Sequence, residues 1–413
     1  MANPLILKSL SFNEYFNFSY FPSIIHWDRR RQKWSIQSGI KKLIPYYASL
    51  SVSAIVCICA GGMVFTSLWL GQCLFQPVHV LSSVVIIILI CFVILSELPW
   101  LLYSKDIVST ENALFTIDAR LSGRVTTKKD IDDASCFASI RKILRRRKGK
   151  TVYAKGDVHG IYMYLSIFLY IASFLLGSII YTYYGFDPFS VIMIFLGIKL
   201  HHGTFVGTSM TILHFSGVVI ESQLICQSLR FLTLFVIGSL ETGDKVLTRI
   251  VRDIGYSNSA LRIYFQLQIL LSNITSFAKL ISAMYLTTAF GGFVFTMVIS
   301  IKGWNVLPPY IYWGFPTVTC VIFGGLIIVL KYAGSIFEIS GVVLMKWKKE
   351  VANSNKMSMR ERRLARISLK MMWQSAIPVG NVGILDKDIK TNYVVNMQDY
   401  AINALVTAEE LMG

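Results

Sequence analysis

Long apolar stretches alternate with polar, mostly basic connections along the chain. A helix needs about 20 predominantly apolar residues to cross the roughly 30 Å hydrocarbon core of a bilayer. Such stretches predict six spans, at about 43–70, 78–103, 161–184, 191–220, 267–299 and 309–330. The stretch 267–299 is longer than one crossing needs, so we expect it to be tilted, kinked at Gly291-Gly292 or extended beyond the bilayer. The apolar stretch 231–240 is too short to cross, and we expect it to continue the fourth helix.

A seventh helix is predicted at about 390–409, although this segment is only weakly apolar. Its polar residues are spaced 4, 3, 4, 4 and 3 positions apart, which places them on one stripe of a helix. They are Asn392, Asn396, Asp399, Asn403, Thr407 and Glu410. Such a helix fits either the wall of a water-filled pore or the membrane surface. Surface helices usually carry Lys and Arg on their polar face, and none follows Lys390, so we favour the pore.

Charge gives the orientation of these spans. The chain is 54% hydrophobic and 15% charged, with a formal net charge of +17. Of its 40 Lys and Arg residues, 36 lie in four segments, which are 1–42, 105–159, 221–266 and 332–390. Because basic connections stay in the cytoplasm, the N-terminus is predicted inside and the C-terminus outside. The basic run 141–150 fits a solvated cytoplasmic face better than a binding site for RNA or anionic lipid. We therefore predict a bilayer and no nucleic acid as partner.

The predicted protein is an all-α polytopic membrane protein. A cytoplasmic segment, 1–42, precedes a domain of seven transmembrane helices, 43–413, with cytoplasmic helical extensions. No cofactor, metal site or catalytic group is predicted. An enzyme is disfavoured because the six histidines do not cluster in the basic loops, and phosphate-binding and nucleophile-turn motifs are absent from the sequence. A secondary transporter, or another membrane protein with six or seven spans and no channel activity, is the alternative function.

Seven spans, a cytoplasmic N-terminus, a highly basic second intracellular connection and very short outer loops resemble the arthropod gustatory and odorant receptor superfamily. The sharpest local match is the run of glycine, apolar and aspartate residues at 379–386, before the last helix. Gustatory receptors then carry Thr-Tyr, five residues and Gln-Phe. Thr391 and Gln398 have the matching separation, whereas Asn392 replaces the Tyr and Asp399 replaces the Phe. The chain thus resembles a divergent gustatory-receptor-like member.

The resemblance implies a ligand-gated, non-selective cation channel in the plasma membrane, opened by a small-molecule tastant or odorant. It implies a homo- or hetero-tetramer whose subunits each contribute the last helix to a central pore. The cytoplasmic ends of helices four to seven would form an anchor region. The implied pore residues are Asn392, Asn396, Asp399, Asn403, Thr407, Glu409 and Glu410. The two glutamates would form a carboxylate ring that attracts cations, or else a frayed acidic terminus, and subunit packing could satisfy some of the asparagines.

The resemblance also implies a ligand pocket in the outer half of the bundle. Lys199, His201 and His202 lie about 12–17 Å below the outer end of the fourth span, where ionisable groups need a cavity or a partner. Aromatic residues that could approach them are Tyr181, Tyr183, Phe293, Phe295, Tyr312 and Trp313. Such a pocket would hold a small molecule by apolar burial and a few polar anchors. The alternative is that the aromatics are ordinary core or membrane-interface residues.

Overall fold

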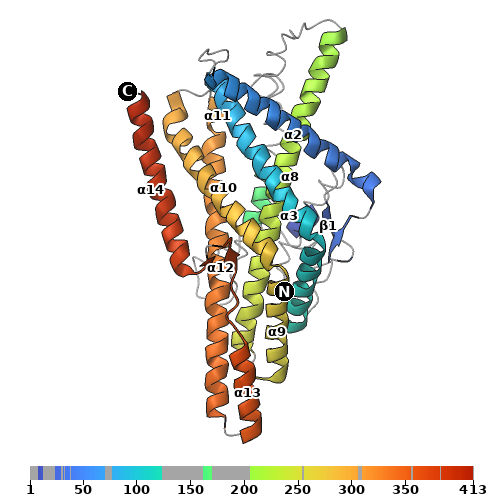
Figure 1. The fold of residues 1–413 in the computed structure, drawn as a ribbon, viewed down its shortest axis with the longest axis vertical. Helices are drawn as coiled ribbons and strands as arrows, with labels where there is room; N and C mark the ends of the chain where they lie inside the picture. Colours follow the sequence, from blue (N-terminus) through green and yellow to red (C-terminus); the bar gives the residue numbers. More distant parts are fainter. Residues whose placement is uncertain are drawn as a thin grey trace, which may run out of the picture. The chain divides into compact units, whose positions relative to one another are not determined.

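A computed structural model describes most of the chain, and its described residues are mainly long α-helices (Figure 1). The described residues are 8–12, 24–28, 31, 33–37, 39–69, 77–122, 161–169, 205–253, 255–305, 309–354, 357–381 and 383–412. The predicted mainly helical class is confirmed. The chain divides into two compact units. Unit 1 holds 1–4, 105–133 and 235–413, and unit 2 holds 5–104 and 134–234.

Unit 2 begins with a small hairpin and continues into long helices. Strand β1 (Ile25–Asp28) pairs antiparallel with β2 (Lys33–Ile36), and the buried Trp27 and Trp34 face each other across it. Helix α2 (Ile40–Trp69) follows, and α3 (Pro77–Ser122) and α8 (Phe205–Asp253) enter the unit with their first parts. Residues 8–12 and 161–169 are also helical.

A buried carboxylate joins three helices of unit 2. Glu97 on α3 accepts a hydrogen bond of 2.7 Å from the Tyr46 hydroxyl on α2. It accepts another, of 2.6 Å, from the Ser228 hydroxyl on α8. A buried carboxyl group is expensive unless it is hydrogen-bonded. The two hydroxyls therefore make Glu97 a cross-link between segments distant in the sequence.

Unit 1 contains the remaining helices and a second small hairpin. After the later parts of α3 and α8, its elements are α9 (Asn258–Asn273), α10 (Thr275–Lys302), η1 (Gly303–Asn305), α11 (Pro309–Tyr312), α12 (Gly314–Asn353), α13 (Met359–Met371), β3 (Pro378–Val379), β4 (Gly383–Ile384) and α14 (Lys387–Met412). Local signals set several helix starts. The Ser257 hydroxyl accepts from the Ala260 N–H at the start of α9, and Ser358 and Glu361 form a capping box at α13.

Two hydrophobic clusters hold unit 1 together. One surrounds the fully buried Trp347 of α12, which stacks edge-on against Tyr264 of α9. The other lies between α10, α12 and α14 and includes Phe293, Leu326 and Met397. In Figure 1, α14 lies beside α10 and α12, as their mutual contacts require. The second cluster therefore fixes one face of the last helix.

The structure divides the long predicted stretch 267–299 into two helices. Ile274 ends α9 and precedes α10 with φ −98° and ψ 8°, outside the regular helical range. Helix α10 continues through Gly291-Gly292 without a break. A Cβ on Gly292 would lie 3.3 Å from Ile322, which shows that this glycine permits close packing of α10 on α12. The extra length of the stretch is therefore the end of α9.

Other boundaries also differ from the sequence prediction. Helix α3 continues to Ser122, well beyond residue 103, and α8 includes the stretch 231–240 without interruption. Among the described residues, two helices are long and apolar enough to cross a membrane, α10 and α12, and Leu43–Ile58 is a shorter apolar segment. Residues 170–184 and 191–204 of the predicted spans 161–184 and 191–220 lie outside the described residues.

Candidate functional site

One face of the last helix packs on the rest of the chain. Met397 and Ala401 are buried against α10 and α12, one helical turn apart. The Tyr393 hydroxyl donates a hydrogen bond to the Leu286 carbonyl oxygen of α10. Phe290 of α10 packs edge-on against Tyr393, with ring centroids 5.9 Å apart. This face combines apolar packing with a specific polar contact, so it sets the rotation of α14 about its axis.

The predicted polar stripe lies on the exposed surface of α14. Asn392, Asn396, Asp399, Asn403 and Thr407 are all exposed, whereas Met397 and Ala401 between them are buried. Val395, Ile402 and Val406 are exposed beside the stripe. Glu409 and Glu410 belong to the last turns of α14, and their side chains lie outside the described residues. The stripe therefore lies on the surface of the chain, away from the face of α14 that packs on α10 and α12.

The run 379–386, which carries the resemblance, forms the joint between α10 and α14. Gly380 has φ +50°, a backbone conformation that favours glycine, and turns β3 into β4. The Gly380 N–H donates to the Lys279 carbonyl at 3.1 Å, and the Ser282 hydroxyl donates to the Pro378 carbonyl at 2.6 Å. Asp386 then caps α14 by accepting from the Ile389 N–H at 2.8 Å. The hairpin thus anchors the start of α14 to α10.

Most of the predicted ligand residues lie outside the described part of the chain. These are Lys199, His201, His202, Tyr181 and Tyr183. Phe293 is buried in the cluster between α10, α12 and α14, where its ring is 5.5 Å from that of Phe323. Tyr312 donates to the Ser300 carbonyl at 2.7 Å and, with the exposed Trp313 and Trp304, forms an aromatic cluster where α10 leads into α12. The structure therefore brings Tyr312 and Trp313 together and gives Phe293 different neighbours.

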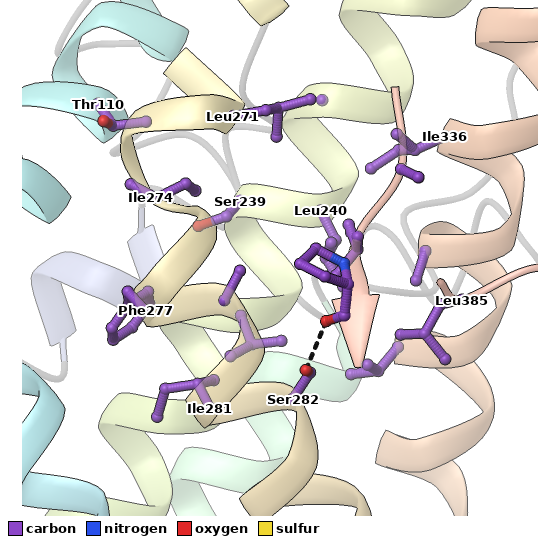
Figure 2. Close-up of a pocket in the computed structure, with 18 of the residues that line it drawn as sticks. Thr110, Ser239, Leu240, Leu271, Ile274, Phe277, Ile281, Ser282, Ile336 and Leu385 are labelled. Atoms are coloured by element: carbon purple, nitrogen blue, oxygen red, sulfur yellow. Dashed lines mark hydrogen bonds between the residues drawn. The ribbon is translucent and has the colours of Figure 1, made fainter. Parts of the chain in front are cut away.

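Unit 1 contains a cavity of about 130 Å³ that the sequence did not indicate. Its walls come from α3, α8, α9, α10, α12 and the segment around β3 and β4 (Figure 2). Leu240, Leu271, Ile274, Phe277, Ile281, Ile336 and Leu385 give most of it an apolar surface. In the predicted orientation, each of these segments belongs to a cytoplasmic end or extension of a span. The cavity is therefore separate from the outer pocket expected from the sequence.

One part of this cavity is polar. The Thr110 hydroxyl is buried and has no hydrogen-bond partner among the described residues. Its neighbour Glu111 is also buried, and desolvation raises the pKa of its carboxyl group to about 7. Glu111 is hydrogen-bonded to Ser239, whose hydroxyl donates to the Phe235 carbonyl at 2.6 Å. The hydrogen bond with Ser239 lowers the pKa of Glu111 and so offsets part of the effect of burial.

The signal that could have located this region is the helical spacing after residue 103. Ile107, Thr110, Leu114 and Ile117 recur at intervals of three or four and are all buried. This periodicity predicts an amphipathic helix rather than a solvated connection. The buried acids Glu111 and Asp118 hide it from a hydropathy scan.

Comparisons with known proteins identify the fold. No protein-family model matches the sequence, and no curated protein matches it. The structure is similar to that of the insect olfactory receptor OR5 from Machilis hrabei, with a TM-score of 0.56 and 10% identity over 97% of this chain and 96% of that chain. For the same receptor in complex with eugenol, the TM-score is 0.55 and the identity 11%, over 98% of this chain and 97% of that chain. The resemblance seen in the sequence is confirmed for the fold, and the chain has the fold of an insect olfactory receptor.

Proposed function

We propose that this chain is a chemosensory receptor of the arthropod gustatory and odorant receptor superfamily, acting as a ligand-gated, non-selective cation channel in the plasma membrane. The observation that carries the proposal is the division of the α14 surface. Its apolar face packs on α10 and α12, and its polar stripe is exposed. The fold shared with the olfactory receptor of Machilis hrabei supports the same assignment.

The chemistry of the stripe favours a pore over contact with lipid. An aspartate at the centre of a transmembrane helix costs about 2.5–3.5 kcal/mol on insertion scales. Asp399 has no ion-pair partner among the described residues and is exposed near the middle of α14, with Asn396 and Asn403 on the same stripe. Several copies of α14 around one axis would enclose water and remove this cost. A tetramer, formed by this chain alone or with related subunits, is the assembly we propose.

The hairpin and Tyr393 offer a route from ligand to pore. The start of α14 is bound to α10 through Gly380, Ser282 and the Asp386 cap, and Tyr393 binds α10 again one to two turns later. A ligand that shifts α10 would therefore move α14 with it. We place this ligand in the outer half of the bundle, near Lys199, His201 and His202. The eugenol complex of the Machilis receptor suggests a small organic molecule of similar size.

Topology provides the first test of this proposal. A tag after Gly413 should bind antibody on unpermeabilised cells, and a tag before Met1 should bind only after permeabilisation. An intracellular C-terminus would exclude α14 as a pore helix. The control is the same pair of tags read on permeabilised cells, where both should be accessible.

Currents provide the second test. The chain is expressed alone and with candidate partner subunits, and cation current is recorded against a panel of tastants and volatiles. Asp399→Asn should change the relative permeability to divalent cations, because it removes a charge from the stripe. Asp388→Asn, at the exposed first turn of α14, is the matched control and should leave permeability unchanged. Substrate uptake by proteoliposomes without channel currents would instead support a secondary transporter.

A further inference from the structure

Three aromatic rings meet where α10 leads into α12. The ring centroids of Trp304 and Tyr312 are 4.8 Å apart, and the ring of Trp313 lies 6.2 Å from the first and 5.8 Å from the second. Each pair is edge-to-face, an arrangement that aromatic rings favour. The three side chains therefore form one aromatic cluster rather than three separate surface residues.

Local contacts of the backbone hold this aromatic cluster in place. The Tyr312 hydroxyl donates to the Ser300 carbonyl, in the last turn of α10, at 2.7 Å. This bond ties the short helix α11 to the end of α10. The Trp313 N–H donates to the Pro309 carbonyl at 3.2 Å, so α11 leads directly into α12. The rings are thus fixed to the ends of both long helices.

Much of the surface of these rings is exposed. Trp304 is 58% exposed and Trp313 is 61% exposed, and Ile301 at the end of α10 is 49% exposed. Soluble proteins rarely leave adjoining large apolar side chains in water. An indole ring combines an apolar body with a polar N–H, which suits a boundary between water and hydrocarbon.

The position of the aromatic cluster along the two helices matches such a boundary. Among the described residues, α10 and α12 are the helices long and apolar enough to cross a membrane. Between Lys279 and Lys302, α10 has no charged residue, and this stretch is about 33 Å long, enough for the hydrocarbon core. On α12 the first charged residue after Trp313 is Lys331, which gives about 26 Å by the same rise per residue. The aromatic cluster therefore lies at the end of both stretches, opposite Lys279 and Lys331.

We propose that the aromatic cluster of Trp304, Tyr312 and Trp313 is a lipid-contact surface that lies in the headgroup layer of the bilayer. This step rests on the proposed function, which places the chain in a membrane. Phosphate and ester oxygens of that layer can accept from the indole N–H groups, while the ring bodies contact the acyl chains. Helices α10 and α12 also hold the last helix, through contacts that include the buried Met397. Lipids at the aromatic cluster would therefore act on the two helices that position α14.

The test measures how deep each indole lies. Full-length protein is labelled with 5-fluorotryptophan and placed in phosphatidylcholine nanodiscs, and Trp304→Phe and Trp313→Phe assign the two ¹⁹F resonances. Three relaxation agents are compared: a spin label on the lipid headgroup, a spin label at the end of the acyl chain, and a water-soluble gadolinium chelate. Paramagnetic relaxation falls with the sixth power of distance. The headgroup label should relax both resonances at least about fivefold more than the chain-end label, because the bilayer centre lies about 15 Å deeper.

Two other tryptophans of unit 1 are the controls. Trp373 is 59% exposed, much like Trp304 and Trp313, but it belongs to the basic segment 332–390, which we predict in the cytoplasm. It should respond mainly to the gadolinium chelate. Trp347 is fully buried and should respond least to all three agents.

Three results would overturn the proposal. They are a stronger response of Trp304 and Trp313 to the chain-end label, a response to the chelate like that of Trp373, and a response as weak as that of Trp347. The last result would mean that another chain covers the rings.

The membrane placement is checked separately by alkaline carbonate extraction. Full-length protein should stay in the membrane pellet, and released protein would contradict the proposed function itself. Protein that stays in the pellet while its two rings respond like Trp373 would overturn the lipid contact alone. The relaxation measurement needs no current, so a failure of the lipid contact is distinct from a failure of the channel proposal.

Discussion

Glu111 should make the stability of this protein decrease as the pH rises. Burial raises the pKa of this carboxyl group from 4.5 to about 7 in the folded chain. In the unfolded chain the group ionises near its ordinary value, so between these two values the folded state binds more protons. Stability is then fully present below about pH 4.5 and is lost as the pH rises through 7. At 1.36 kcal/mol for each pKa unit, the loss amounts to about 3 kcal/mol.

The measurement is the free energy of unfolding in detergent from pH 5 to pH 8, for the parent chain and Glu111→Gln. Subtracting one free energy of unfolding from the other removes the contribution of other titrating groups. One such group is Asp244, because burial raises its pKa as well. This difference should change by about 2–3 kcal/mol across the range, in the direction that favours the parent chain at low pH. Asp106→Asn, at an exposed position of the same helix, is the control. A difference that is constant with pH would refute the burial argument.

Three further predictions concern α14. Met397→Ala should lower the free energy of unfolding by about 2–5 kcal/mol, since this side chain is fully buried between α10, α12 and α14; a loss below 0.5 kcal/mol would contradict the packing. Asp386→Ala should lower the free energy of unfolding by about 1 kcal/mol, because the helix cap is lost, and Asp386→Asn should keep most of the cap's contribution. Asp388→Ala is the exposed control, and equal effects at the two positions would exclude the cap. Replacing Glu409 and Glu410 together by Gln should alter divalent permeation or block, measured as reversal-potential shifts, and unchanged currents would exclude the carboxylate ring.

The sequence predicts α14 well because its signal is local. Spacing alone places Asn392, Asn396, Asp399, Asn403 and Thr407 on one face, and the structure leaves that face exposed. The same spacing leaves Met397 and Ala401 for the opposite face, which is buried. The predicted bounds of 390–409 lie inside the observed Lys387–Met412. Helical periodicity is sufficient here because each position depends only on its neighbours one turn away.

The sequence predicts the packing of α3 after residue 103 against α8 poorly because its signals are distant. Asp118 is buried and paired at 2.5 Å with Arg249, which lies 131 residues later. Read locally, both residues look like members of a solvated basic connection. The break at Ile274 is marked by no proline or glycine, and its only local signal is the polar pair on each side, Ser272-Asn273 and Thr275-Ser276. The cavity, with walls from five helices and the hairpin segment, needs all these pairings at once.

The proposed place of α14 in a pore would also affect how the protein is made. If α14 lines a pore, a single newly inserted subunit would expose Asp399 and the asparagine stripe to hydrocarbon, and it would be an incomplete product until its neighbours arrive. Membrane insertion and oligomerisation would then be coupled steps, and surplus subunits would display a polar face on which quality control can act. If the assembly is heteromeric, the abundance of this chain at the cell surface would follow the supply of its partner rather than its own rate of synthesis.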